Sequence, residues 1–507
     1  MLKQTDPHKD LTDPRPHAVV IGSGFGGLAA AVRLGARGYR VSVFEKLDAP
    51  GGRAYVHRQD GFTFDAGPTI ITVPFLLEEL WTLCGKKMSD DLEMREIHPF
   101  YVMRFDDGEE VRCWRDVDKM REEVARVAPD DVAGYNRFLK KSEQIYRVCF
   151  EQLGAQAFHS LGKSIITVPR IFTVGGHLSV YQMVSKFFKS KKLRTVFSFH
   201  PLLIGGDPFN TTAAFCLINH LERNWGVHAA MGGTGAIVQG LVGLIEGQGG
   251  AVRCNAEVDE ILVRDGEAAG VTLKTGETVD ADIVVSNAES GFTYSHLLRN
   301  HNVRRWHERR LKNYNYSMSL FVWYFGTNKQ YDDVEHHSIV LGPRYKELLH
   351  DIFRKKVLAD DFSLYLHRPT ATDPSLAPPG HDAFYVLSPV PHLQADVDWT
   401  VQAEPYRQAI EQRLSETLLP GLKDAVVSSK IMTPLDFRDR LNSLNGAAFG
   451  FEPSLFQSAW FRPHNKSEEL KGLYIVGAGC HPGAGVPGVV MSAKILDEVV
   501  PDASVYV

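Results

Sequence analysis

The sequence predicts an α/β fold in which one domain is assembled from separated segments and a mixed α+β region is inserted between them. Two observations support this prediction. Glycine-rich strand–loop–helix units stand near both ends of the chain, at residues 17–46 and 472–500. Between about 290 and 465 the sequence is irregular, aromatic and rich in proline. Strands alternating with helices are typical of a parallel sheet, so the two outer units are expected to share one.

The first unit has the pattern of a Rossmann-like dinucleotide site. The run HAVVI, from His17, is apolar and β-branched, as in a strand buried on both faces. Glycines follow at G-x-G-x-x-G spacing, with one extra: Gly22, Gly24, Gly26 and Gly27. The helix expected over Leu28–Arg37 would point its N-terminal N–H groups at a pyrophosphate. The spacing therefore predicts a bound dinucleotide.

A second strand, RVSVFE, ends in an acid at Glu45. This position is close to the spacing expected for a carboxylate that binds a ribose hydroxyl. A carboxylate would repel a 2′-phosphate, which argues against NADP. The motif does not by itself separate FAD from NAD.

Composition restricts the classes of function. The chain has 507 residues, enough for two or three domain-sized units. Its net charge of −5 gives no support to nucleic-acid binding. Six scattered cysteines without a C-x-x-C pair indicate neither a disulfide framework nor a cysteine metal site, and a reducing cytoplasm is expected. No metal site is predicted, because the adjacent His336 and His337 cannot easily face one ion and no H-E-x-x-H motif is present. Both histidines are interpreted as exposed.

The N-terminal segment and the hydropathy pattern indicate whether the chain could span a membrane. Residues 1–16 are polar, contain three prolines and have no apolar core of a signal peptide, so we expect a disordered leader. No run approaches the ~20 apolar residues of a transmembrane helix. The chain is therefore expected to touch a membrane without spanning it.

The coarse pattern gives domain boundaries. We assign 17–75, 228–290 and 465–507 to the dinucleotide-binding domain, and 76–227 and 291–464 to substrate-binding and membrane-associating regions. Helical patterns lie around 118–150 and 181–200, a helix and short strand over 232–258, and a meander over 259–288. A strand is expected at SMSLFVWYFG, residues 317–326. Several small sequential domains are the alternative, but no linker-like tract divides the chain.

A second glycine cluster lies near the C-terminus, at Gly477, Gly479, Gly483, Gly485 and Gly488. So many glycines between a strand and a helix weaken packing unless a ligand or another backbone comes close. A mobile surface loop is the alternative. The glycines at 232–235 lack a preceding buried strand and are interpreted as a helix start, which leaves one dinucleotide site and requires an external electron acceptor.

The segment 181–206 mixes basic and aromatic side chains. The basic residues and phenylalanines that alternate there are Lys186, Phe187, Phe188, Lys189, Lys191, Lys192, Arg194, Phe197 and Phe199. They fit either an interfacial helix beside a membrane or a solvated helix whose rings enter the core. Both interpretations remain open at this level.

Beyond the nucleotide motif, the sequence resembles a known family over most of residues 17–497. The segments that carry the resemblance are GGRAY, GFTFDAGPT, FSFHPLLIGGDPF, ERNWGV, GGTGA, FSLYLH, YVLSPVPHL, DFRDRLNS, QSAWFRPHN and LYIVGAGCHPGAGVPGV. They look like the bacterial and fungal type phytoene desaturases of carotenoid synthesis. The resemblance implies an FAD flavoprotein of the amine-oxidase and protoporphyrinogen-oxidase fold group.

The resemblance also implies roles for particular residues. Cofactor binding is expected at Gly22, Gly24, Gly26, Gly27, Glu45, Lys46, Gly52, Arg53, Gly67, Pro68, Val258, Gly477, Gly479, Gly488 and Val489. His481 is the candidate general base, and its alternative role is to orient the loop through a hydrogen bond. Cys480 stands where the family often has threonine. A packed side chain is expected there rather than a nucleophile.

Chemistry agrees with FAD, because removing two hydrogens from a saturated C–C bond needs a stronger oxidant than NAD. The expected partners are phytoene and partly desaturated carotenoids, a membrane surface, and quinone or oxygen as electron acceptor. The enzyme is expected in the cytoplasm, on the inner face of the membrane. The rival functions are a carotenoid oxygenase, ketolase or isomerase, an amine oxidase, and a non-enzymatic prenyl-binding escort of the GDP-dissociation-inhibitor kind.

Overall fold

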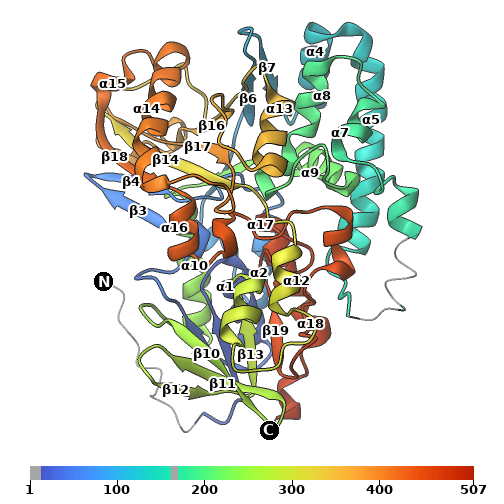
Figure 1. Ribbon diagram of the computed structural model, residues 1–507, viewed down its shortest axis with the longest axis vertical. Coiled ribbons are helices and arrows are strands. Elements are labelled where there is room, and N and C mark those ends of the chain that lie inside the picture. The colour runs from blue at the N-terminus through green and yellow to red at the C-terminus, as the bar shows by residue number, and fades with distance from the viewer. Residues whose placement is uncertain (1–12, 160–161, 163–168, 507) are drawn as a thin grey trace.

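Two sheets organise the molecule, with a five-stranded sheet in the lower half of Figure 1 and a seven-stranded sheet in the upper half. The structure is a computed structural model, and it describes residues 13–159, 162 and 169–506. Helices cover both sheets, and the N-terminal and C-terminal parts of the chain meet in the lower half.

The five-stranded sheet is parallel throughout. In spatial order its strands are β19 (Leu473–Ile475), β13 (Ile283–Ser286), β1 (His17–Ile21), β2 (Arg40–Phe44) and β9 (Ala251–Arg253). Every residue of β1 is buried, as its continuous apolar run predicts. The predicted α/β fold with a Rossmann-like domain built from separated segments is therefore confirmed.

The two faces of this sheet bury different partners, because alternate residues of a strand point to opposite sides. Ala18 and Val20 share a core with helices, whereas Val19 and Ile21 share one with an antiparallel meander. The helices are α1 (Phe25–Ala36), α2 (Phe75–Leu83), α10 (Thr234–Gly247) and α17 (Val486–Lys494). The meander comprises β10 (Val258–Arg264), β11 (Glu267–Leu273) and β12 (Thr278–Asp280).

The seven-stranded sheet is antiparallel except where β15 runs parallel to β6. Its order is β18 (Val426–Met432), β14 (Ser319–Thr327), β17 (Asp382–Val390), β16 (Leu364–His367), β15 (His337–Val340), β6 (Tyr101–Arg104) and β7 (Glu110–Cys113). Strand β14 is buried along its whole length. Its Phe321 and Trp323 pack toward α14 (Trp399–Thr417), and Leu320 and Val322 face the other way, into a cavity.

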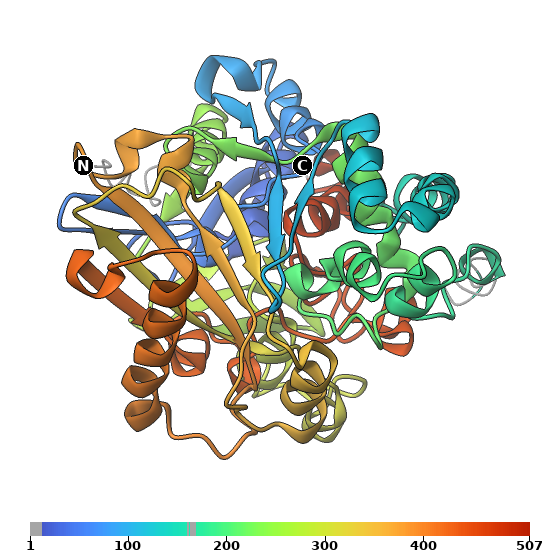
Figure 2. The ribbon, with the colours of Figure 1, turned by 90° about the horizontal axis from the view of Figure 1, so that it is seen from above.

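A group of helices stands beside this sheet, visible in teal and green on the right of Figures 1 and 2. They are α4 (Val117–Val127), α5 (Val132–Tyr146), α7 (Val180–Ser185), α8 (Lys191–Ser198) and α9 (Leu217–Trp225). The sequence predicted helices around 118–150 and 181–200. Within the second range, residues 186–190 separate α7 from α8, and the Ser190 side chain accepts a hydrogen bond from the Leu193 N–H to start α8.

The remaining elements are short. They are β3 (Val56–Gln59), β4 (Phe62–Asp65), β5 (Met94–Glu96), β8 (His228–Ala230), α3 (Met88–Asp91), α11 (Ser290–Phe292), α12 (Glu308–Asn313), α13 (Tyr345–His350), α15 (Leu422–Ala425), α16 (Pro434–Asp439) and α18 (Leu496–Val499).

The structure corrects the interfacial interpretation of segment 181–206. Phe188, Phe197 and Phe199 are almost fully buried, and Phe188 and Phe197 stack 4.6 Å apart between ring centroids. All three rings belong to one core cluster, with Phe197 on the buried face of α8, so they do not meet a lipid surface. Lys186, Lys189 and Lys191 remain exposed on the other side.

The last residues of the segment expected to be a disordered leader make contacts with the rest of the chain. Arg15 pairs with Asp13 and donates from Nη1 to the Gln248 carbonyl at 3.0 Å. Pro16 accepts a hydrogen bond from the Arg40 N–H. Residues 1–12 lie outside the described residues, and the domain boundaries stay predictions.

Candidate functional site

The N-terminal glycine loop connects β1 to α1. Gly22 has a φ of 89°, a conformation that side chains rarely adopt. A Cβ atom at Gly27 would lie 2.0 Å from the Gly22 carbonyl oxygen, so only glycine fits. Gly24 is the N-cap residue of α1 and has no side chain that could bond to the first N–H groups of the helix. The first N–H groups of α1 have no acceptor within the helix and form an anion site.

The C-terminal glycine loop lies directly against the first one. A Cβ atom at Gly26 would lie 3.0 Å from the Gly477 backbone and 2.6 Å from Asn287 Oδ1. The Gly477 N–H donates to Ser492 Oγ on α17, and Gly488 and Val489 of the same helix line the cavity described below. The two glycine clusters predicted from sequence therefore belong to one site.

Gly479 is an exception among the predicted residues, because it does not line the cavity. A Cβ atom there would lie 2.1 Å from Ser290 Oγ. Close packing against α11 therefore explains this glycine.

Glu45 directly follows β2 beside the first loop and is almost fully buried. Its Oε2 accepts hydrogen bonds from the Ser23 N–H (2.9 Å) and Ser23 Oγ (2.6 Å), and its Oε1 accepts one from the Leu47 N–H. The carboxylate is therefore held rigidly at the edge of the cavity, as a ribose-binding acid must be.

The segment after β2 adds a cation. Arg53 donates from Nε to the Ala448 carbonyl at 2.7 Å and from Nη2 to Ser443 Oγ at 2.9 Å. Burial lowers its pKa, and the nearby Glu289 carboxylate partly offsets this effect. A Cβ atom at Gly67 would lie 2.5 Å from the Arg53 carbonyl oxygen. Gly52, Arg53, Gly67 and Pro68 all line the cavity.

The last two predicted cofactor residues also line the cavity, near Glu45. Lys46 donates from Nζ to the Asp439 carbonyl (2.7 Å) and to Asn442 Oδ1 (2.6 Å). Val258 begins β10 and is buried. With the exceptions of Gly27 and Gly479, which are explained by close packing, the predicted cofactor residues thus surround one space. The free helix N-terminus, the fixed acid and the backbone without Cβ atoms fit a flavin dinucleotide.

The same cavity continues into the inserted region and holds about 700 Å³. Its walls come from both sheets and from the helical group. Apolar side chains on its wall include Phe150, Leu153, Leu202, Leu203, Ile218, Leu221, Met318, Leu320, Val322, Ile339 and Leu341. A long apolar space joined to the cofactor loops suits a hydrocarbon ligand.

His481 lies in the wall of this cavity, within the C-terminal loop. Its Nε2 lies 3.0 Å from the Leu153 carbonyl oxygen, so we place the proton on Nε2, as the donor. Nδ1 has no hydrogen-bond partner among the described residues. Burial lowers the pKa of His481 to about 4. A neutral ring tied to Leu153 agrees with the positioning role, and its low pKa makes it a weak base.

The pKa of His481 predicts acid lability. Between pH 6.5 and about 4 the unfolded chain binds a proton here that the folded chain does not. The free energy of unfolding should therefore fall as the pH drops through this window, by up to about 3 kcal/mol. His481→Gln, which keeps an N–H donor, should show a shallower dependence in urea unfolding at about pH 7 and about pH 5. Equal losses in the two proteins would contradict this assignment.

Three residues of the site had no recognised signal in the sequence. Asn287 follows β13 and packs its amide against the glycines of both loops. Glu289 accepts a hydrogen bond from the Phe292 N–H, while its Oε1 is unpaired among the described residues. Glu222 is a buried carboxylate in the cavity wall. The position of Asn287 and Glu289 after a sheet strand is the signal that could have found them.

Glu222 is held by two hydrogen bonds. Its Oε1 accepts from the Tyr101 hydroxyl at 2.7 Å, and its Oε2 lies 3.0 Å from His200 Nε2. Its motif, ERNWGV, carries part of the family resemblance but gives no hint that the acid faces a cavity.

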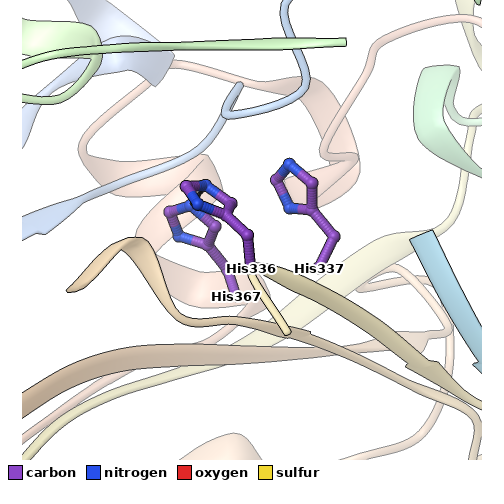
Figure 3. Close-up of side chains that lie close together, drawn as sticks. All are labelled: His336, His337 and His367. Carbon is purple, nitrogen blue, oxygen red and sulfur yellow. Dashed lines mark hydrogen bonds between the residues drawn. The ribbon is translucent and has the colours of Figure 1, made fainter. Parts of the chain in front are cut away.

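Two predictions about reactive side chains have different outcomes. Cys480 is fully buried, so the packed interpretation is confirmed, and burial raises the pKa of its thiol to about 12, which disfavours the thiolate. The interpretation of His336 and His337 as exposed is wrong. Both are buried and lie beside His367 (Figure 3), because β15 and β16 pair at this point.

Comparisons with known proteins agree with this geometry. Residues 25–495 match the family described as flavin containing amine oxidoreductase. The chain is 51% identical over 491 residues to a neurosporene-forming phytoene desaturase of Cereibacter sphaeroides, covering 96% of this chain and 95% of the relative. It is 47% identical over 477 residues to a lycopene-forming phytoene desaturase of Pseudescherichia vulneris, covering 94% and 97%.

Solved structures share the fold at low identity. An oxidoreductase of Methanosarcina mazei superposes with a TM-score of 0.63 at 18% identity, covering 95% of this chain and all of that chain. A cyclohexylamine oxidase of Brevibacterium oxydans gives 0.59 at 14%, covering 97% and 99%. These likenesses show the shared fold. The match to a family described as flavin containing, together with the nearly full-length match to phytoene desaturases, confirms the predicted flavin cofactor. The chain belongs to the flavin containing amine oxidoreductase family.

Proposed function

We propose that this protein desaturates phytoene stepwise in carotenoid biosynthesis, with FAD as cofactor. The observation that carries the proposal is the cavity of about 700 Å³, whose apolar walls run from the inserted region to the cofactor loops. Phytoene is a hydrocarbon without polar groups, so an apolar channel is the form of recognition available to it. The identity of 51% and 47% to two phytoene desaturases, over nearly the whole chain, supports the same substrate.

The protein chain itself positions the substrate and excludes water from the cavity. When bound, the flavin supplies a strong two-electron oxidant that accepts a hydride. Residues such as Leu320 and Val322 on β14 hold the polyene by apolar contact. Alignment of a single bond with the reactive atom accounts for a large share of such a rate enhancement.

Co-expression with enzymes that make phytoene tests the proposal. Extracts should contain coloured polyenes, and their absorption spectra should reveal how many double bonds were introduced. Accumulation of unchanged phytoene by flavin-loaded protein would refute the assignment. Hydrogen peroxide formation with a primary amine instead would indicate the amine-oxidase alternative.

We propose further that phytoene enters from a membrane surface at the mouth of the cavity. Phe172, Phe456 and Phe461 line the cavity and yet are 48%, 73% and 39% exposed. Apolar rings around an opening fit the acyl boundary of a bilayer. Among the described residues no helix combines the length and apolarity needed to cross a membrane. The inner face of the cytoplasmic membrane remains the proposed location.

The double variant Phe456→Glu and Phe461→Glu should weaken binding to anionic liposomes, because charges then replace the rings at the mouth. We expect at least a tenfold loss in sedimentation, with the flavin spectrum unchanged. A charge-reversing control is Lys189→Glu with Lys191→Glu, which are exposed on α8 and its approach. If only this control weakens binding, the entry surface lies at the helical group.

The electrons are proposed to leave to an external acceptor, a quinone or oxygen, because the sequence holds one complete dinucleotide motif. Turnover should stop without oxygen and resume when a soluble quinone is added. Undiminished turnover in the absence of both would contradict this proposal.

A further inference from the structure

Three histidines meet on the seven-stranded sheet (Figure 3). His337 opens β15 and pairs with His367, the last residue of β16. Directly paired residues share a face of a sheet, so both rings project to the same side. His336 directly precedes β15, so the alternation of side chains between the two faces of the strand does not fix the direction of its ring. Its ring centroid lies 4.8 Å from that of His367.

Hydrogen bonds satisfy only part of this cluster. His336 Nε2 lies 3.1 Å from His367 Nε2, and His336 Nδ1 lies 2.7 Å from Thr372 Oγ1. His337 Nδ1 lies 2.7 Å from the Tyr365 hydroxyl. His337 Nε2 and His367 Nδ1 have no partner among the described residues. A buried nitrogen without a partner is costly, which at His337 Nε2, on the ring whose Nδ1 is already bonded to Tyr365, indicates that something else binds there.

The environment favours neutral rings. His336, His337 and His367 are 4%, 0% and 2% exposed. Burial lowers all three pKa values, that of His336 to about 3. A neutral imidazole carries a lone pair, the form in which histidine binds metal ions.

A small space adjoins the cluster. It measures about 10 Å³, close to the volume that one small species needs. His336 and His367 line it together with the carboxylates of Asp65 and Asp373. His337 does not line this space, so the two acids stand on the side of His336 and His367. An ionised carboxylate there would offset part of a divalent charge.

We propose that His336, His337 and His367 bind a divalent transition-metal ion, with zinc as the ion that fits a set of imidazole ligands. One nitrogen from each ring lies within 4.8 Å of the others. Zinc–nitrogen bonds of about 2.0 Å in tetrahedral geometry place ligand atoms about 3.3 Å apart. The His336–His367 pair already meets this spacing at 3.1 Å, and the proposal requires the His337 ring to rotate toward that pair.

The contacts around the cluster resemble an outer ligand shell. Ligating histidines commonly give their second nitrogen to a hydroxyl, carbonyl or carboxylate, as Thr372 and Tyr365 provide here. Tyr365 also lines the large cavity, where its hydroxyl lies 3.1 Å from Thr69 Oγ1. An ion would thus join β15 to β16 and fix one wall of the cavity. This inference does not depend on the substrate.

Elemental analysis of the flavin-loaded protein tests the site. Protein purified without chelators and dialysed against Zn²⁺ should retain about one zinc per chain after removal of free metal. X-ray absorption at the zinc edge should show nitrogen ligands at about 2.0 Å and no sulfur. The double variant His337→Gln and His367→Gln should retain less than about a tenth of this zinc.

His392→Gln is the matched control, since His392 is buried outside the cluster. It should retain zinc as the unmodified protein does, and the flavin content should report that each variant is folded. Absence of zinc from the unmodified protein would overturn the proposal and indicate water between neutral rings. Zinc bound equally by the double variant, or through sulfur, would overturn it as well. Pigment formation plays no part in either result.

Discussion

Replacing Gly24 by valine should abolish flavin binding while most of the fold survives. Gly24 has a φ of −67°, which valine adopts without backbone strain, so the effect falls on the ligand. A Cβ atom there would lie 3.0 Å from Asn287 Nδ2, with its methyl groups in the space of the pyrophosphate. If the pyrophosphate then loses two charge-assisted hydrogen bonds from backbone N–H groups of the loop, binding weakens by at least about 3 kcal/mol, or roughly a hundredfold in affinity.

The measurement is the ratio of flavin to protein absorbance, with circular dichroism to report the fold. Gly243→Ala is the control, because a Cβ atom in that part of α10 meets nothing within 4 Å. It should keep its flavin and gain slightly in stability. Gly27→Ala should instead destabilise the fold, since its Cβ strikes the Gly22 carbonyl oxygen. Full flavin occupancy in Gly24→Val would show that the dinucleotide lies elsewhere.

Replacing Ala214 by phenylalanine should block turnover without loss of flavin. Ala214 lines the cavity and is half-buried, while its neighbour Ala213 is fully buried. A ring at this position fills space that the polyene needs, and misplacement of a substrate by about 1 Å costs on the order of a hundredfold in rate. Cells that make phytoene should therefore accumulate it, or products with fewer added double bonds.

Ala125→Phe provides the matched control. Ala125 is a half-exposed residue of α4 and does not line the cavity. The same change in volume there should leave pigment formation unaltered. An unchanged pigment profile in Ala214→Phe, at normal flavin content, would mean that the substrate occupies another part of the cavity.

Local pattern sufficed for much of the fold and for most of the cofactor site. The run from His17, the glycine spacing and Glu45 depend on neighbours within about thirty residues, so strand, turn and helix follow from the sequence. The same reasoning found the C-terminal loop, the meander and strand β14. The two glycine loops contact each other, as expected from the prediction that their strands share one parallel sheet. No local signal in the sequence specifies how closely Gly26 approaches Gly477.

Only the tertiary structure decided which way side chains face when their partners come from distant segments. The rings of Phe188 and Phe197 enter the core because α5 and the seven-stranded sheet cover them. Gly479 packs on Ser290, and Asn287 fills the space between the loops. His337 and His367, thirty residues apart in sequence, meet because β15 and β16 pair in one register. Sequence periodicity determines the buried face of an element, whereas long-range strand pairing determines what that face contacts.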